Sequence, residues 1–213
     1  RICEEIYMKE VLIYKHEIEE WGKQKLASIS TRKKSFKHWI EKLYHWPKDF
    51  SHKDDVYVWL SCVEALAAVG EGNYGVGAVL LDEKGDVVVS DHNKSFYPDF
   101  RSDLHAEMVV LNSWEAKKID DGKIKELDYR LISSLEPCPM CLTRLLYSDI
   151  KIISYAAPDD LGGMLRLIDR MPPFFRETAR RHQFSQANAS PKLLEAAWKI
   201  MELTMLDLNK RVE

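Results

Sequence analysis

The chain has 213 residues, enough for one large domain or two small ones, and 46% of them are hydrophobic, which is ample for a core. Its formal net charge of −3 gives no overall attraction to nucleic acid or to an anionic membrane. The 4 cysteines are too few for a disulfide scaffold, and no apolar run approaches the ~20 residues of a membrane span. The charged start of the chain does not resemble a signal peptide, so we expect a cytoplasmic protein.

The first 50 residues are predicted to be a helical extension, and residues 51–213 a single domain. Helical spacing of isoleucines favours a helix over residues 1–27, and a shorter helix with an apolar stripe should follow and end at Pro47. The isoleucines are Ile2, Ile6, Ile13 and Ile18, and the stripe is Phe36, Trp39, Ile40 and Leu43. The basic run Arg32-Lys33-Lys34 is interpreted as a solvated turn, with nucleic-acid contact as the alternative. We expect the extension to be a packing layer; an oligomer arm and a partner-binding piece are the alternatives.

A helix, a break and a hairpin come next. Residues 51–54 form a capping-box pattern, which predicts a helix from there to about Val69. The continuous apolar run Val76 to Leu81 is typical of a strand that is covered on both faces. A turn and a second strand, Val87 to Ser90, predict a hairpin. Asn93 follows that second strand.

His105 and Glu107 form the first half of a candidate metal site. They follow a loop that contains Phe96 and Tyr97, which are candidates for a pocket wall. Residues two apart diverge on the side of a helix, so His105 and Glu107 converge only if a metal lies off the helix N-terminus. The residues just before His105 include side chains that can cap a helix there.

Cys138 and Cys141 form the second half, after a predicted strand from Tyr129 to Leu135. Pro137 can open a helix at this point, so that the two sulfur atoms share one face of its first turn. The amides at a helix start favour thiolate over thiol. The next strand, Ile150 to Ala156, should be parallel to the previous one and joined to it by a right-handed crossover.

One imidazole, two thiolates and a carboxylate are the parts of a catalytic zinc site. His105, Cys138 and Cys141 would leave the fourth tetrahedral position of one zinc ion for water, whose pKa zinc lowers towards about 7. Glu107 would lie close to that water without being a ligand, as a general acid/base requires. Taken alone, the cysteine pair also fits a redox pair or half of a structural zinc site. The two halves together favour catalytic zinc.

The pattern H-x-E followed by P-C-x-x-C is the signature of zinc deaminases, and over about residues 54–165 the chain resembles the cytidine deaminase-like superfamily. It is most similar to the branch of bacterial guanine deaminases and tRNA adenosine deaminases. The resemblance is carried by Val76-Gly77-Ala78-Val79, Asn93, His105-Ala106-Glu107, Glu136-Pro137-Cys138-Pro139-Met140-Cys141-Leu142 and Ile153-Ser154-Tyr155-Ala156-Ala157. It implies a three-layer α/β/α sandwich with zinc at the starts of two central helices. The predicted elements agree, because strands that alternate with helices after a hairpin indicate a mixed sheet, here of about five strands, between helical layers.

The resemblance also implies a function. It implies a hydrolase of C–N bonds that converts an exocyclic amine of a nucleobase or nucleoside to a carbonyl and releases ammonia. Asn93 would bind the base or sugar, and the amide of Ala106 the incoming oxygen or the base edge. Since the family commonly forms dimers, the resemblance also points to a homodimer.

The substrate is less sharply indicated than the reaction. A purine is favoured, guanine first, because the run Pro139 to Leu142 resembles bacterial guanine deaminases. Those enzymes also carry an acidic residue after the fourth strand, which is missing or displaced in the stretch 158–163. A tRNA substrate is the less favoured alternative, since the composition is not basic. A non-catalytic partner subunit is a further alternative, which the presence of Glu107 disfavours.

Three segments close the chain. A short helix is predicted from Met164 to Arg170, and the proline pair at 172–173 interrupts the chain before Phe174. Phe174, like the aromatic residues of the earlier loop, is a candidate to stack on a substrate ring, with core packing as the alternative. The basic stretch 176–182 is interpreted as a solvated helix face, with phosphate or RNA contact as the alternative. A final helix starts after Ser190, and its apolar stripe should dock on the sheet. That stripe is Leu194, Ala197, Trp198, Met201, Met205 and Leu208.

Overall fold

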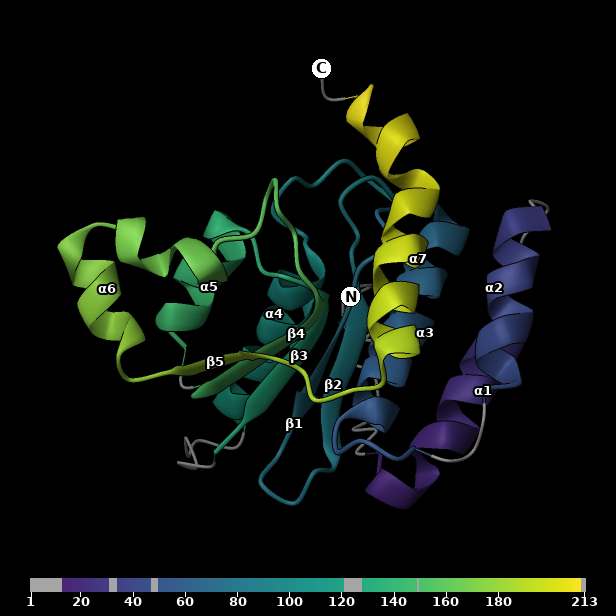
Figure 1. Cartoon of the computed structure of the whole chain (residues 1–213), viewed down its shortest axis with the longest axis horizontal. Helices are drawn as coiled ribbons and strands as arrows, with labels where there is room; N and C mark the ends of the chain where they lie inside the picture. The colour runs from purple at the N-terminus through teal and green to yellow at the C-terminus, as the bar shows by residue number, and fades with distance from the viewer. Residues whose placement is uncertain (1–12, 31–33, 47–49, 121–127, 149, 212–213) are drawn as a thin grey trace.

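The computed structural model describes residues 13–30, 34–46, 50–120, 128–148 and 150–211. A five-stranded mixed sheet lies at its centre, in the order β2-β1-β3-β4-β5 (Figure 1). The strands are β1 Gly77–Leu81, β2 Val87–His92, β3 Arg130–Leu135, β4 Ile152–Ala157 and β5 Gln183–Gln186. The α-helices are α1 Ile18–Ser28, α2 Lys34–Tyr44, α3 Asp55–Glu71, α4 Ala106–Asp120, α5 Pro139–Leu146, α6 Pro173–Ala179 and α7 Pro191–Asn209. Two 3-10 helices are η1 Lys15–Glu17 and η2 Leu165–Arg170.

Helices cover both faces of the sheet, which confirms the predicted three-layer α/β/α sandwich. The helices α3 and α7 pack side by side on one face, and α1 and α2 pack outside α3 (Figure 1). The helix α4 covers the opposite face, with α5 beside it. Among the described residues, we find no helix with the length and apolar character that crossing a membrane requires.

Strand direction decides where the site can form. The strand β1 is antiparallel to both β2 and β3, so the predicted hairpin is confirmed. The strands β3, β4 and β5 are parallel to one another, which confirms the predicted crossover between β3 and β4. Because parallel strands end at the same edge of a sheet, the segments after Leu135 and after Ala157 leave side by side. That edge is where the cysteine pair is delivered.

The edge strand β5 was not located by the sequence. Its four residues, Gln183 to Gln186, contain neither an apolar run nor a clear alternation of apolar and polar residues, because most of them are exposed and need not be apolar. Only its pairing with β4 makes it a strand.

The packing of α3 on β1 depends on a small residue in the strand. A Cβ atom at Gly77 would collide with the carbonyl of Ser61 in α3, so glycine lets helix and strand approach closely. Each residue of β1 is buried, as its continuous apolar sequence predicted.

The predicted helix over residues 1–27 is wrong at Ile13. Ile13 pairs with Val87, with reciprocal backbone hydrogen bonds of 3.0 and 2.9 Å, and the α-helix begins only at Ile18. The edge of β2 offers unpaired backbone groups, and Ile13 satisfies two of them instead of continuing a helix. The second predicted helix is present as α2, and Ile18 and Leu43 are buried in the same core as the sheet. Residues 1–12, the basic residues at 32–33 and Pro47 lie outside the described part.

The predicted capping box at residues 51–54 does not form either. Asp54 is the N-cap of α3, but its side chain makes no capping hydrogen bond. Its carboxylate instead accepts two hydrogen bonds from the guanidinium of Arg130, at 2.6 and 2.7 Å. A bidentate bond to a guanidinium is stronger than a neutral cap, so a partner from β3 takes the carboxylate. The helix after it runs two residues beyond the predicted Val69, to Glu71.

Candidate active site

His105, Cys138 and Cys141 meet at the starts of two helices, as the sequence predicted. His105 directly precedes α4, Cys138 is the N-cap of α5, and Cys141 lies in the first turn of α5. Their ligand atoms all lie within 4.8 Å of one another, and His105 Nδ1 is 3.6 Å from Cys138 Sγ. Pro139 occupies the first turn of α5, where a missing amide hydrogen costs nothing.

The donor set fits zinc in its chemistry as well as its geometry. A hydrogen bond from Cys141, together with one from His105, lowers the pKa of Cys138 to about 4, so this sulfur is a thiolate at neutral pH. One imidazole and two cysteine sulfurs are ligands that Zn²⁺ prefers, and three protein ligands are typical of its catalytic sites. These three residues would therefore hold the ion.

Glu107 lies beside the ligands and is held by two hydrogen bonds. Its Oε2 accepts from Cys141 Sγ at 3.4 Å, and its Oε1 accepts from Ser133 Oγ at 3.2 Å. The side chain is almost completely buried, and this burial raises its pKa above the ordinary value. Ser133 lies inside β3 and was not singled out in the sequence, because a serine in a strand carries no signal of its own.

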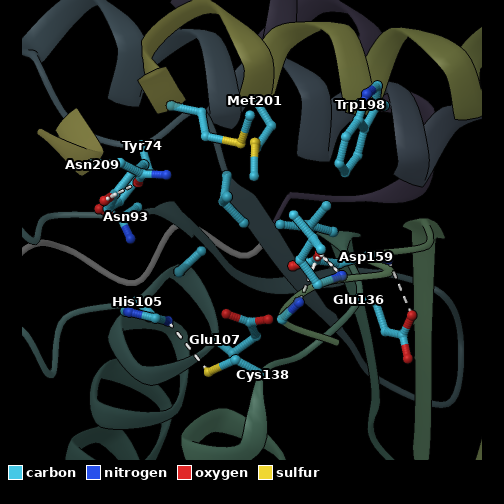
Figure 2. Close-up of a pocket in the computed structure, with 16 residues that line it drawn as sticks. Tyr74, Asn93, His105, Glu107, Glu136, Cys138, Asp159, Trp198, Met201 and Asn209 are labelled. Carbon is cyan, nitrogen blue, oxygen red and sulfur yellow. Dashed lines mark hydrogen bonds between the residues drawn. The ribbon is translucent and has the colours of Figure 1, made fainter. Parts of the chain in front are cut away.

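A cavity of about 460 Å³ adjoins the ligands and Glu107. Figure 2 shows His105, Glu107 and Cys138 on one side of it, with Trp198 and Met201 of α7 opposite them. A volume of a few hundred Å³ with mostly apolar walls is typical of small-molecule sites.

Two of the predicted substrate-binding residues line this cavity, namely Asn93 and Ala106. Asn93 is buried, and its Oδ1 accepts a hydrogen bond from the amide of Ser95 at 3.0 Å, which fixes the side chain. Ala106 is fully buried at the start of α4. Both therefore line the same cavity as the zinc ligands, and their role in binding a substrate stays a prediction.

The three predicted stacking residues do not line the cavity. Phe96 packs between the rings of Tyr74 and Phe100, with centroid distances of 5.4 and 5.6 Å. Tyr97 is 55% exposed, in the same loop. Phe174 is 61% exposed on α6 and packs against Tyr147. The orientation of the Phe96 and Phe174 rings is set by packing against neighbouring rings. The sequence does not determine the direction in which the segments that carry them turn.

Two acidic residues reach the cavity from the edge of the sheet where β3 and β4 end. The carboxylate of Glu136 is buried and accepts hydrogen bonds from the amide of Asp159 at 3.1 Å and from Arg166, whose amide lies at 3.1 Å and Nε at 2.9 Å. A Cβ atom at Gly163 would lie 2.5 Å from this carboxylate, so glycine is needed for the loop to close over it. Asp159 itself lines the cavity, in the stretch where the sequence left the acidic residue missing or displaced.

The predicted stripe of α7 serves two surfaces rather than one. Leu208 and Ala197 are buried in the core, as predicted. Trp198, Met201 and Met205 line the cavity, and Trp198 and Met201 also pack against the core. Apolar residues at helical spacing do not say which neighbour they face, so the sequence could not separate the two sets.

The family model described as "cytidine and deoxycytidylate deaminase zinc-binding region" matches residues 51–157, half of the chain. The chain belongs to this family. The match begins where the predicted deaminase domain begins and contains His105, Glu107, Cys138 and Cys141. The predicted superfamily and its zinc cofactor are confirmed, and the enzyme class, hydrolases of C–N bonds, is confirmed at the level of the family.

Two curated relatives and one solved structure illustrate what the chain is similar to. It is 31% identical over 111 residues to a tRNA-specific adenosine deaminase of Bacillus subtilis, which is 52% of this chain and 66% of the relative. It is 36% identical over 106 residues to a tRNA-specific adenosine deaminase of Haemophilus influenzae, which is 50% of this chain and 58% of the relative. The matches thus span less than two thirds of either relative. The guanine deaminase structure from Nitrosomonas europaea has a TM-score of 0.53 at 17% identity and covers 76% of this chain and 91% of that chain, which shows a shared fold.

Proposed function

We propose that this chain is a zinc-dependent hydrolytic deaminase that converts an exocyclic amine of a nucleobase or nucleoside to a carbonyl and releases ammonia. The observation that carries the proposal is the position of Glu107, a buried carboxylate in contact with the sulfur of Cys141 and open to the cavity. A structural zinc site has no use for such a carboxylate, whereas a general acid/base must lie within reach of both water and substrate.

The proposed roles follow from this arrangement. Zinc, when held by His105, Cys138 and Cys141, supplies a Lewis acid that makes a water molecule a nucleophile at neutral pH. Glu107 accepts a proton from the attacking water, delivers one to a ring nitrogen, and then assists the departure of ammonia. Ser133 holds one carboxylate oxygen of Glu107, and so orients the other towards the reacting atoms.

The amide of Ala106 and the side chain of Asn93 are proposed to position the substrate. Ala106 lies at the start of α4, where backbone amides have no partner within the helix and can donate to an incoming oxygen or a base edge. The Asn93 carbonyl oxygen is already engaged by Ser95, which leaves its amide hydrogens as donors at the cavity rim. Hydrogen-bond donors aimed at the oxygen where charge develops favour the reaction.

A purine ring is the proposed target. The guanine deaminase of N. europaea shares the fold, and the curated relatives are tRNA-specific adenosine deaminases. A free base or nucleoside is proposed in preference to RNA, because the chain has a net negative charge. Guanine is proposed first, because the run Pro139 to Leu142 resembles that of bacterial guanine deaminases. Deamination of adenosine in tRNA is the second candidate, favoured by the names of the relatives in sequence.

The described part of residues 1–50 is proposed to be a packing layer added to the deaminase domain 51–213. Ile18 and Leu26 of α1 and Leu43 of α2 are buried in the core that also contains the sheet. The homodimer and the cytoplasmic location expected from the sequence stay predictions.

Ammonia release by the zinc-loaded protein tests the function. The substrates would be guanine, guanosine, adenine, adenosine, cytosine, cytidine and a tRNA anticodon stem-loop, with Glu107→Ala as the control. We expect release from a purine base or nucleoside, and loss of at least 10²-fold in the variant at unchanged zinc content. Release from the stem-loop alone would move the function to tRNA deamination. Full activity of the zinc-loaded variant would refute the mechanism.

A further inference from the structure

The cavity wall opposite the zinc ligands comes from α7, which lies outside the residues matched by the family model. Figure 2 shows Trp198 and Met201 extending from α7 towards the side that carries His105 and Glu107. Met205 continues the same wall one turn further along the helix. A flat indole beside polarisable thioethers is a surface on which a planar heterocycle can stack.

This wall is fixed rather than free to swing. At the start of α7, the amide of Ser190 donates a hydrogen bond of 2.6 Å to the buried carboxylate of Asp55. Near its end, Thr204 Oγ1 donates to the carbonyl of Asn73 at 3.0 Å. The buried face of the helix packs in the core between these two points. A wall that is held in place before the substrate arrives costs no ordering on binding.

The charges around the cavity are acidic. Its described lining includes three acidic residues, Glu107, Glu136 and Asp159, and none of these described lining residues is a lysine or an arginine. Arg166, which lies next to the cavity, already donates to Glu136 and to Asp160. Apart from the zinc ion itself, the described lining offers a phosphate no lysine or arginine, and like-charge contact with Glu107 or Asp159 selects against such a ligand.

We propose that Trp198 and Met201 are the specificity wall of this site, which takes an uncharged planar base or nucleoside and rejects the corresponding 5′-phosphates. This inference rests on the proposed function and deepens it. The ring lies between the indole and the side of the cavity that holds Ala106 and Glu107, and the carboxylates around it favour ligands that donate hydrogen bonds.

Binding without turnover tests the proposal separately from the reaction. The zinc-loaded Glu107→Gln variant of the 213-residue chain would be titrated by calorimetry with guanine, guanosine, adenosine, GMP, AMP and an anticodon stem-loop. We expect a base or nucleoside to bind, and its 5′-monophosphate to bind at least about tenfold more weakly. Trp198→Ala in this background should weaken nucleoside binding on the order of 10- to 100-fold, and Trp198→Phe should recover most of it.

Leu206→Ala is the matched control, because Leu206 lies on α7 with 67% of its side chain exposed and outside the cavity lining. It should leave binding unchanged, and circular dichroism would check that α7 is formed in each variant. The proposal is overturned if monophosphates bind as tightly as nucleosides, if only the stem-loop binds, if no ligand binds, or if both Trp198 variants bind like the parent. Nucleoside binding without ammonia release by the wild-type protein would instead refute the proposed function and leave the wall in place.

Discussion

Within the described residues, two clusters each bring three potential metal ligands within 4.8 Å of one another, and their chemistry differs. One is His105, Cys138 and Cys141, which faces the cavity. The other is Glu64, Asp91 and His92, which lies between α3 and the end of β2. Proximity of donor atoms is therefore not what distinguishes the proposed zinc site.

The charges of the second cluster are paired with one another and with neighbouring side chains. Lys25 of α1 forms an ion pair with the fully buried Glu64. Nδ1 and Nε2 of His92 each lie 3.0 Å from a carboxylate oxygen, of Glu64 and Glu71 respectively, and because carboxylates accept, this arrangement favours the doubly protonated ring, which is not a metal ligand. Paired charges that satisfy one another serve structure, whereas a thiolate and an imidazole beside a cavity leave room for an ion and a substrate.

Removing a proposed zinc ligand should have the largest effect on metal content and activity. Cys138→Ala should abolish stoichiometric zinc and reduce deamination to background, because two ligands do not hold a catalytic zinc ion. Cys62→Ala is the matched control, since Cys62 is buried in α3 away from the site and should keep one zinc per chain. Metal analysis of both variants decides; a full zinc complement in Cys138→Ala would contradict the proposed ligand set.

Removing a charge from the second cluster should affect stability and leave zinc in place. Glu64→Gln leaves Lys25 and His92 without their shared carboxylate, so we expect a loss of about 3–5 kcal/mol in the free energy of unfolding. Glu19→Gln, which removes a half-buried surface partner of Lys23, should cost no more than about 1 kcal/mol. Denaturant unfolding measures both, and similar costs for the two variants would show that the cluster is not a buried ion network.

The same cluster predicts a pH dependence of stability. Burial lowers the pKa of His92, but hydrogen bonds to Glu64 and Glu71 outweigh it and raise the pKa to about 8. Burial raises the pKa of Glu64, and the bonds from His92 and Lys25 outweigh it and lower that pKa to about 2. The stabilisation from His92 is thus complete below its ordinary pKa of about 6.5 and is lost as pH rises through about 8, while that from Glu64 is lost only as pH falls below about 4.5.

Melting of the zinc-loaded protein between pH 6.5 and pH 9 measures the His92 part. The wild type should lose on the order of 1–2 kcal/mol more than His92→Gln over this range. Asp91 forms an ion pair with Lys94 and also lies 3.4 Å from Nδ1 of His92, so both proteins are compared with this pair intact. Parallel curves for the two proteins would show that His92 does not titrate in this window.

The smallest expected effects come from one hydroxyl in each cluster. Ser133 Oγ donates to Glu107 at 3.2 Å, and Ser90 Oγ donates to Glu64 at 2.8 Å. Ser133→Ala should lower kcat on the order of tenfold by releasing the acid/base, whereas Ser90→Ala should leave kcat unchanged and cost about 1 kcal/mol of stability. Steady-state kinetics and denaturant unfolding measure kcat and stability for the two variants. Equal kcat values would contradict a positioning role of Ser133.

The zinc ligands and the position of Glu107 beside them could be predicted, because His105 and Glu107 lie two residues apart and Cys138 and Cys141 three residues apart in the sequence. A helix start at Pro139 fixes the relation of Cys138 to Cys141, and the parallel order of β3 and β4 fixes the edge to which they are delivered. The fold class followed in the same way, from apolar periods that distinguish strands from helices.

The second cluster could not be predicted, because its members come from α3 and β2, their partner Lys25 comes from α1, and no spacing relates them. Lys25 and Glu64 meet only because α1 packs on α3, and His92 joins them through the register of the hairpin. The same holds for Ser133, whose role depends on β3 lying beneath the start of α4.

By itself, the sequence determined the layered fold and the three residues that could hold zinc, and it singled out Glu107 as the candidate acid/base, since each rests on local spacing or on the periodicity of one element. Only the tertiary structure decided that Trp198 and Met201 face the site while Phe96 and Phe174 do not. The physical reason is that a cavity wall is a contact between distant segments. Its residues are chosen by how α7 packs across the sheet, and the helical period of α7 is the same whether a side chain meets the core or a substrate.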